Sequence, residues 1–202
     1  PPIGELEPGL WLVDLSRAEM AAIDAKLDAL AAARCVIFDM RGYPNATHGV
    51  LAHLLDEPEH DRWMHVAHVI RPSLPGQPRP AHEWSSFGWD LAPKAPRLRG
   101  KVVFMTGPGA ISYAESVMGY VEALGLPIVG AATAGTNGNV REVALPSGAS
   151  FFFTGMKVTR HDGARSHLEG IRPTVPVSRT IAGVTAGRDE VLERARWCMH
   201  EP

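Results

Sequence analysis

Two short apolar runs constrain the fold of this chain more than any other feature. The first is Cys35-Val36-Ile37-Phe38-Asp39-Met40, and the second is Lys101-Val102-Val103-Phe104-Met105-Thr106. Each run is almost continuously apolar and is followed by a turn that contains glycine, a pattern typical of strands buried on both faces of a parallel sheet. Because such a sheet needs helices on both of its faces, the two runs predict an α/β fold.

The rest of the chain supplies the other elements of this fold. We expect helices that end near Ala33 and cover 48–55, 112–124 and 188–199, with further strands at 10–15 and 127–130. A glycine-rich loop follows at 134–139, and strands at 140–145 and 150–160 flank a turn. The pattern therefore predicts one domain over residues 1–202, with a mostly parallel sheet, flanking helices and a β-hairpin after the glycine-rich loop.

Residues 71–99 differ from the rest of the chain, because prolines recur among three large aromatic residues, Trp84, Phe87 and Trp89. Proline removes a backbone donor and fixes φ, so we expect no regular structure here. A loop of this length inserted in a compact domain is usually functional. It either lies on the surface with its aromatic side chains pinned down, or lines a binding cleft.

Composition excludes several classes of function. The 202 residues carry 20 Lys and Arg against 22 Asp and Glu, a formal net charge of −2, so no basic surface for nucleic acid is indicated. No apolar run approaches the roughly 18 residues that cross a bilayer. The two cysteines predict neither a disulfide framework nor a zinc ribbon, and Cys35 is expected to be a plain core residue. No metal site or cofactor is expected.

Ser112 occupies a position that suits a nucleophile. It follows a buried strand and the turn Gly107-Pro108-Gly109, and it begins a helix. A tight turn there lifts the hydroxyl clear of the sheet, while the free N–H groups and the dipole of the helix start favour an oxyanion. The alternative is that Ser112 only caps the helix, with Glu115 completing a capping box.

The segment Gly107-Pro108-Gly109-Ala110-Ile111-Ser112-Tyr113-Ala114-Glu115 resembles the nucleophile segment of the C-terminal processing (tail-specific) and tricorn-type serine peptidases. Other segments are similar to that family in the same order along the chain. They are Ile37 to Asn45, the strand and glycine-rich loop from Leu126 to Asn139, the paired turns at Leu145–Gly148 and Asp162-Gly163, and Gly170 to Val177. The resemblance covers about residues 8 to 195.

This resemblance implies a fold like that of the Clp-protease and crotonase group, and peptide hydrolysis through a serine acyl-enzyme. Ser112 would be the nucleophile, and the N–H of Tyr113 would be one oxyanion donor. The second donor would come from the turn after Met40, with Gly42 preferred and Asn45 or Ala46 as alternatives. Gly42 is equally well interpreted as an ordinary turn residue.

The general base is where the chain departs from the family pattern. No lysine occurs between Lys101 and Lys157, and an amide such as that of Asn137 cannot accept a proton at neutral pH. The tricorn-type arrangement implies instead a histidine from a preceding segment, with Glu169 in a supporting role. Glu169 is equally well interpreted as a solvated charge at the edge of the domain, and Asn137 is expected to be a loop contact. His161 and His167 are alternative bases within the chain.

The leading hypothesis is therefore the core of a tricorn-like serine peptidase. The start Pro1-Pro2 indicates a processed chain or a fragment, so we expect the base to lie on a segment outside it and the fragment alone to be inactive. The alternative is a non-catalytic binding module for a lipophilic or peptide ligand. The resemblance implies a peptide or protein C-terminal segment as substrate, assembly into a homo-oligomer, and an exported or periplasmic location for many relatives.

Overall fold

A six-stranded sheet forms the centre of the computed structural model, which describes residues 1–68 and 83–199. Its strands lie in the order β1-β2-β3-β6-β7-β11, and only β1 runs antiparallel to its neighbour. The bounds are β1 Ile3–Glu7, β2 Leu10–Asp14, β3 Cys35–Asp39, β6 Lys101–Thr106, β7 Ile128–Gly130 and β11 Val175–Pro176. The predicted mostly parallel sheet is confirmed.

Alternating side chains of the two central strands build a separate core on each face of this sheet. Val36 and Phe38 of β3 belong to the larger core, whereas Cys35 and Ile37 belong to the smaller one. The ring of Phe38 stacks on Phe104, its partner in the β3–β6 register, with ring centroids 4.9 Å apart. Burial on both faces explains why the interior positions of these strands are apolar, with Asp39, Lys101 and Thr106 only at strand ends.

Helices cover both faces. The larger core takes buried side chains from α1 Met20–Asp24, α2 Leu27–Ala32, the 3₁₀ helix η1 His48–His53 and α3 Tyr113–Ala123. The smaller core is closed by α5 Glu190–Ala195 and the 3₁₀ helix η2 Arg196–Met199, while α4 Ile181–Thr185 precedes α5. The helices predicted up to Ala33 and over 188–199 are therefore each divided in two, and that over 48–55 is a 3₁₀ helix.

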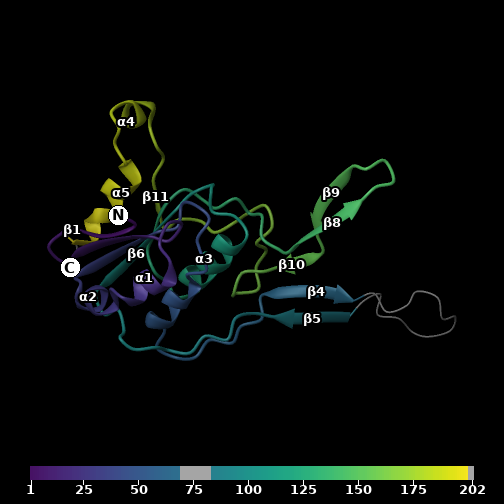
Figure 1. Ribbon diagram of the computed structural model, residues 1–202, viewed down its shortest axis with the longest axis horizontal. Helices are drawn as coiled ribbons and strands as arrows, with labels where there is room; N and C mark the ends of the chain where they lie inside the picture. The colour runs from purple at the N-terminus through teal and green to yellow at the C-terminus, as the bar shows by residue number, and fades with distance from the viewer. Residues whose placement is uncertain (69–82, 200–202) are drawn as a thin grey trace.

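Two smaller sheets extend from this centre (Figure 1). Strands β10 Met156–Val158, β4 Met64–His68 and β5 Glu83–Phe87 form an antiparallel sheet in the order β10-β4-β5. Strands β8 Val140–Ala144 and β9 Ser150–Thr154 form the hairpin, which projects away from the large sheet. The predicted second strand of the hairpin, 150–160, is wrong beyond Thr154. The strand is interrupted at Gly155, and β10 pairs with β4 in a different sheet.

The prediction that 71–99 lacks regular structure is wrong for Glu83–Phe87, which pairs along its whole length with β4 as β5. Its part at 71–82 lies outside the described residues. Trp89 follows the end of β5 and stacks on Tyr120 with ring centroids 5.4 Å apart. Trp89 therefore anchors this segment to the larger core, as the expectation of a surface loop with pinned aromatic side chains has it, whereas Trp84 and Phe87 are exposed.

The prediction that Cys35 is a plain core residue is also wrong. Cys35 and Cys198 form a disulfide that links β3 to η2 across 163 residues of chain. Both cysteines are buried, Cys35 at 0% and Cys198 at 2% exposure. The bond therefore ties the C-terminal helical segment directly to a central strand. Because the two cysteines are so far apart in the sequence, no local pattern indicated that their sulfur atoms bond.

We expect that removing this disulfide destabilises the protein, because the unfolded chain regains the freedom of a long loop. The double variant Cys35→Ala/Cys198→Ala should lose about 2–5 kcal/mol of unfolding free energy. Thermal melting with and without dithiothreitol is the measurement. Reductant should lower the melting temperature of the wild type and leave the double variant unchanged. Two free thiols in the unreduced, denatured wild type would contradict the assignment.

Candidate active site

Two turns meet at the carboxyl edge of the large sheet, where parallel α/β sheets place their sites. One follows β3 and begins at Arg41, and the other follows β6 at Gly107–Gly109; the strands themselves pair at Asp39 and Met105. A Cβ at Gly109 would lie only 2.6 Å from the carbonyl oxygen of Arg41. Glycine therefore permits the second turn to pack directly on the first.

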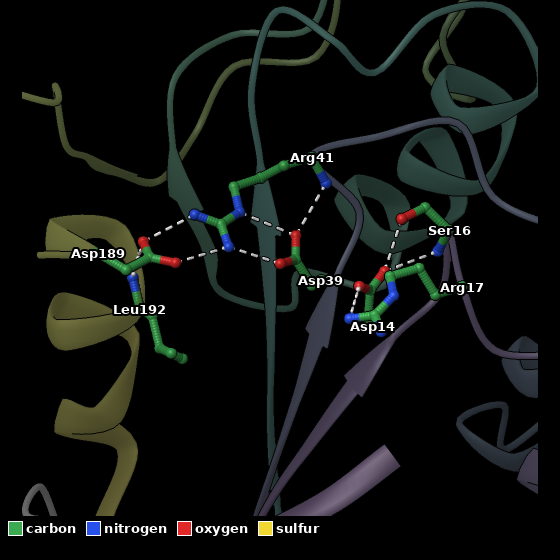
Figure 2. Close-up of polar contacts among 7 residues, drawn as sticks. All are labelled: Asp14, Ser16, Arg17, Asp39, Arg41, Asp189 and Leu192. Atoms are coloured by element: carbon green, nitrogen blue, oxygen red, sulfur yellow. Dashed lines mark hydrogen bonds and ion pairs between the residues drawn. The ribbon is translucent and has the colours of Figure 1, made fainter. Parts of the chain in front are cut away.

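The side chain of Arg41 fixes the first of these turns (Figure 2). Its Nε and Nη2 donate to Asp39 at 2.9 and 2.6 Å, and its Nη1 and Nη2 donate to Asp189 at 2.7 and 2.8 Å. Hydrogen bonds to Asp39 and Asp189 raise the pKa of Arg41 against the opposing effect of burial. Asp189 also caps α5 by accepting the N–H of Leu192. The guanidinium therefore joins the end of β3 to the start of α5.

Gly42, the predicted oxyanion donor, stands directly after this arginine. A Cβ there would lie 3.2 Å from Cβ of Ser16, whose hydroxyl donates to Asp14 at 2.6 Å. The turn is thus held by Arg41 on one side and packed on Ser16 on the other. Within the described part of the chain, the N–H of Gly42 donates no hydrogen bond.

Ser112 adopts a backbone conformation that residues other than glycine rarely adopt, with φ 51° and ψ −114°. Its side chain makes no capping hydrogen bond to α3, so the interpretation of Ser112 as an ordinary helix cap is wrong. The N–H of Ser112 donates to the carbonyl of Thr136 at 3.2 Å. Among the described residues, the N–H of Tyr113 has no acceptor. A half-buried serine is thus held in a strained turn beside an unused backbone donor.

Glu115 does not form the predicted capping box with Ser112, because its carboxylate binds the glycine-rich loop instead. Its carboxylate is 2% exposed and accepts hydrogen bonds from the Thr133 hydroxyl at 2.6 Å and from the N–H groups of Gly135 and Thr136 at 2.6 and 2.8 Å. These partners all belong to the glycine-rich loop or its approach. Glu115 therefore anchors that loop to α3, one turn beyond Ser112.

Asn137 and Glu169 flank the same loop. The amide of Asn137 donates to the Ser116 hydroxyl at 3.1 Å. Glu169 is exposed, with its carboxylate 4.0 Å from Arg172, but its backbone lies against Gly135: a Cβ at Gly135 would come within 2.9 Å of the Glu169 nitrogen. The structure thus brings Ser112, Asn137 and Glu169 to one loop.

The two histidines predicted as alternative bases lie in different surroundings. His161 is buried against Tyr120, with ring centroids 4.4 Å apart, and its Nδ1 is 3.2 Å from a carboxylate oxygen of Asp61. It packs on Gly119, which is about 10 Å along α3 from Ser112. His167 is exposed and lines a pocket with Asn137.

His48 was not among the predicted site residues, yet the structure places it beside the residue that follows Ser112. Its Nδ1 is 2.6 Å from the hydroxyl of Tyr113, and its backbone N–H donates to the same oxygen at 3.0 Å. Burial lowers the pKa of His48 below its ordinary value and raises that of Tyr113. Burial thus favours the neutral form of this ring. Only the long-range packing of η1 on α3 reveals this pair.

The family model of Peptidase family S41 matches residues 60–177, which is more than half of the chain. No curated protein matches the sequence. Among the described residues, no helix is long and apolar enough to cross a membrane.

Solved structures share the fold. A candidate peptidase from Parabacteroides merdae superposes with a TM-score of 0.76 at 19% identity, covering 96% of this chain and 62% of that one. The photosystem II D1 C-terminal processing protease gives 0.57 at 15% identity, covering 84% and 42%. The tricorn protease gives 0.58 at 13% identity, covering 95% and 18%. The predicted crotonase-like peptidase fold is confirmed, and the chain spans less than two thirds of each of these structures.

Replacing the loop anchor should weaken the fold. In Glu115→Gln, an amide N–H₂ would face the backbone donors of Gly135 or Thr136, so we expect a loss of about 2–4 kcal/mol of unfolding free energy. Denaturant unfolding is the measurement, with the exposed Glu19→Gln as the matched control. Equal stability of both variants would show that the carboxylate does not hold the loop.

Ser112→Gly should stabilise the protein relative to Ser112→Ala, because glycine adopts φ 51° without strain. The expected difference is about 1–3 kcal/mol in unfolding free energy. The control pair is Ser147→Gly and Ser147→Ala in the hairpin turn, where the structure shows no positive φ. A Ser112→Gly protein no more stable than Ser112→Ala would rule out backbone strain at this position.

Proposed function

Because this chain belongs to peptidase family S41, we propose that it forms the core of a serine peptidase whose nucleophile is Ser112. The observation that carries this proposal is the strained turn at Ser112, whose side chain does not cap the helix that it begins. Strain of 1–3 kcal/mol at a non-glycine residue persists where the surrounding structure holds it, typically at functional sites. The family and its fold make peptide bonds the expected substrate.

In the proposed reaction, Oγ of Ser112 attacks the carbonyl carbon of the scissile peptide bond and gives up its proton to a general base. The carbonyl oxygen becomes negatively charged and is stabilised by backbone N–H donors. The carbon–nitrogen bond then breaks, and the leaving amine takes the proton from the base. Water hydrolyses the resulting ester and restores the serine.

The proposed oxyanion donors are the N–H groups of Tyr113 and Gly42. Both are without acceptors in the described part of the chain, and the close packing of Gly109 on Arg41 brings their two turns together. The ion pairs of Arg41 support this role for Gly42, because they hold the turn in one position before substrate binds. Preorganised donors stabilise charge without reorganising during the reaction.

The general base in this proposal is a histidine from a segment that precedes the core, as the resemblance to tricorn-type peptidases implies. The glycine-rich loop supports it by offering amides and a hydroxyl in place of a lysine. Glu169 would orient that histidine, since its backbone already lies against the loop that binds Ser112. Asn137 would contact the substrate or the loop. Residues 1–202 alone would then be inactive.

A non-catalytic module that binds a lipophilic or peptide ligand is the alternative. The observation in its favour is that Trp84 and Phe87 of β5 are 48% and 37% exposed. Such a module would need no reactive serine, so chemical labelling of Ser112 distinguishes the two functions.

Assembly and location belong to the same proposal. The hairpin exposes large apolar side chains on both of its faces, including Val140, Phe151, Phe152 and Phe153, and this favours the homo-oligomer that the resemblance implies. The buried disulfide favours an oxidising compartment, in keeping with an exported or periplasmic protein. A peptide or protein C-terminal segment remains the proposed substrate.

The test is labelling of the full-length protein with a fluorophosphonate, which reacts with activated serines. We expect one label per chain, mapped by peptide mass analysis to Ser112 and absent in Ser112→Ala. The matched control is Ser116→Ala, one turn further along α3, which should keep the label. Full-length protein that stays unlabelled, or a label that survives Ser112→Ala, would contradict the peptidase proposal and favour the binding module.

A further inference from the structure

A pocket of about 620 Å³ opens between the glycine-rich loop and the three-stranded sheet. Its walls come from five places in the chain: β5, the loop itself, the end of β9, β10 and the turn that follows β10. The lining residues that matter for its chemistry are Trp84, Asn137, Met156, Lys157, Arg165 and His167.

The pocket adjoins the proposed active site through the glycine-rich loop. Asn137 lines the pocket and binds Ser116, while its neighbour Thr136 accepts the N–H of Ser112. On the other side, Gly138 packs on Thr154, because a Cβ at Gly138 would lie 2.5 Å from the Thr154 hydroxyl. A chain bound at Ser112 would therefore have this pocket within reach of its neighbouring side chains.

The charge of the pocket is one-sided. Lys157 and Arg165 line it together with His167, and none of the described lining residues is acidic. Asp162, the acid next to this turn, accepts the N–H of Ala164. Lys157 and Arg165 are both exposed, and among the described residues neither forms an ion pair, so their charges remain available to a ligand.

Contacts with neighbouring groups hold the side chains of Lys157 and Arg165 in place. The ammonium of Lys157 lies 5.9 Å from the ring centroid of Trp84, and Nε of Arg165 donates to the carbonyl of His167 at 2.7 Å. The remaining nitrogens of the guanidinium keep their donors, which suit a carboxylate. Trp84 and Met156 supply apolar surface for the methylene groups that carry such a carboxylate.

We propose that this pocket is a specificity site that binds an acidic side chain, Asp or Glu, of the peptide substrate through Lys157 and Arg165. The proposal rests on the proposed peptidase function, since the pocket matters as a neighbour of Ser112. It adds a preference in substrate sequence that neither the family nor the fold specifies.

The experiment measures peptide binding to the full-length protein by fluorescence anisotropy. The probes are fluorescein-labelled hexa-alanine peptides, amidated at the C-terminus, in which each position in turn carries Glu or Gln. We expect Glu to bind about tenfold more tightly than Gln at one position. This ratio should shrink as ionic strength rises.

The variants Lys157→Met and Arg165→Met should each remove most of that preference. Lys26→Met and Arg99→Met are matched controls, because both side chains are exposed, lie outside the pocket and should leave the ratio unchanged. Equal binding of the Glu and Gln peptides at every position, or no binding at all, would overturn the proposal. A Glu preference that survives both pocket variants would do the same.

Two further measurements test the source of the carboxylate and the proposed peptidase function separately. Hexa-alanine with a free C-terminus tests the other source of a carboxylate, and a preference for that peptide alone would overturn binding of a side chain. Fluorophosphonate labelling of the same wild-type preparation reports on the peptidase function. Labelled protein without a Glu preference disproves the pocket alone, whereas a Glu preference in unlabelled protein disproves the nucleophile alone.

Discussion

The close approach of two turns at the edge of the sheet is the constraint on which the rest of the proposed site depends. Parallel pairing of β3 with β6 brings the turns together, and glycine at position 109 lets them touch. The charged groups around Arg41 then hold one turn against α5, so that the end of β3 has little freedom. A site that stabilises developing charge needs such rigidity, because donors that must move lose part of their effect.

The glycine-rich loop is held by an equally specific contact. A buried carboxylate is costly unless all of its oxygens are hydrogen-bonded, and Glu115 meets this condition with three donors. The loop thus takes its position from α3, the helix that Ser112 begins. Ser112, the loop and the charged pocket on the far side of the loop are in this way parts of one connected unit.

Prediction from sequence succeeded where a local pattern carries the physical cause. The runs at 35–40 and 101–106 contain strands because burial on both faces favours apolar side chains at nearly every position. It failed where pairing is non-local: β5 forms because β4 lies beside it, and β10 leaves the hairpin for the same reason. Glu115 fits a capping box by spacing, but three donors from the loop outcompete that local bond.

The α/β class, the peptidase-like order of motifs and the serine at a strand-to-helix turn follow from local patterns of neighbouring residues. The bond between Cys35 and Cys198, the pairing of Arg41 with Asp189, and the pocket that Lys157 shares with Arg165 come from tertiary packing. These contacts join residues that lie far apart in the chain or on separate elements. Their formation depends on how sheets and helices pack, which spacing in a sequence does not encode.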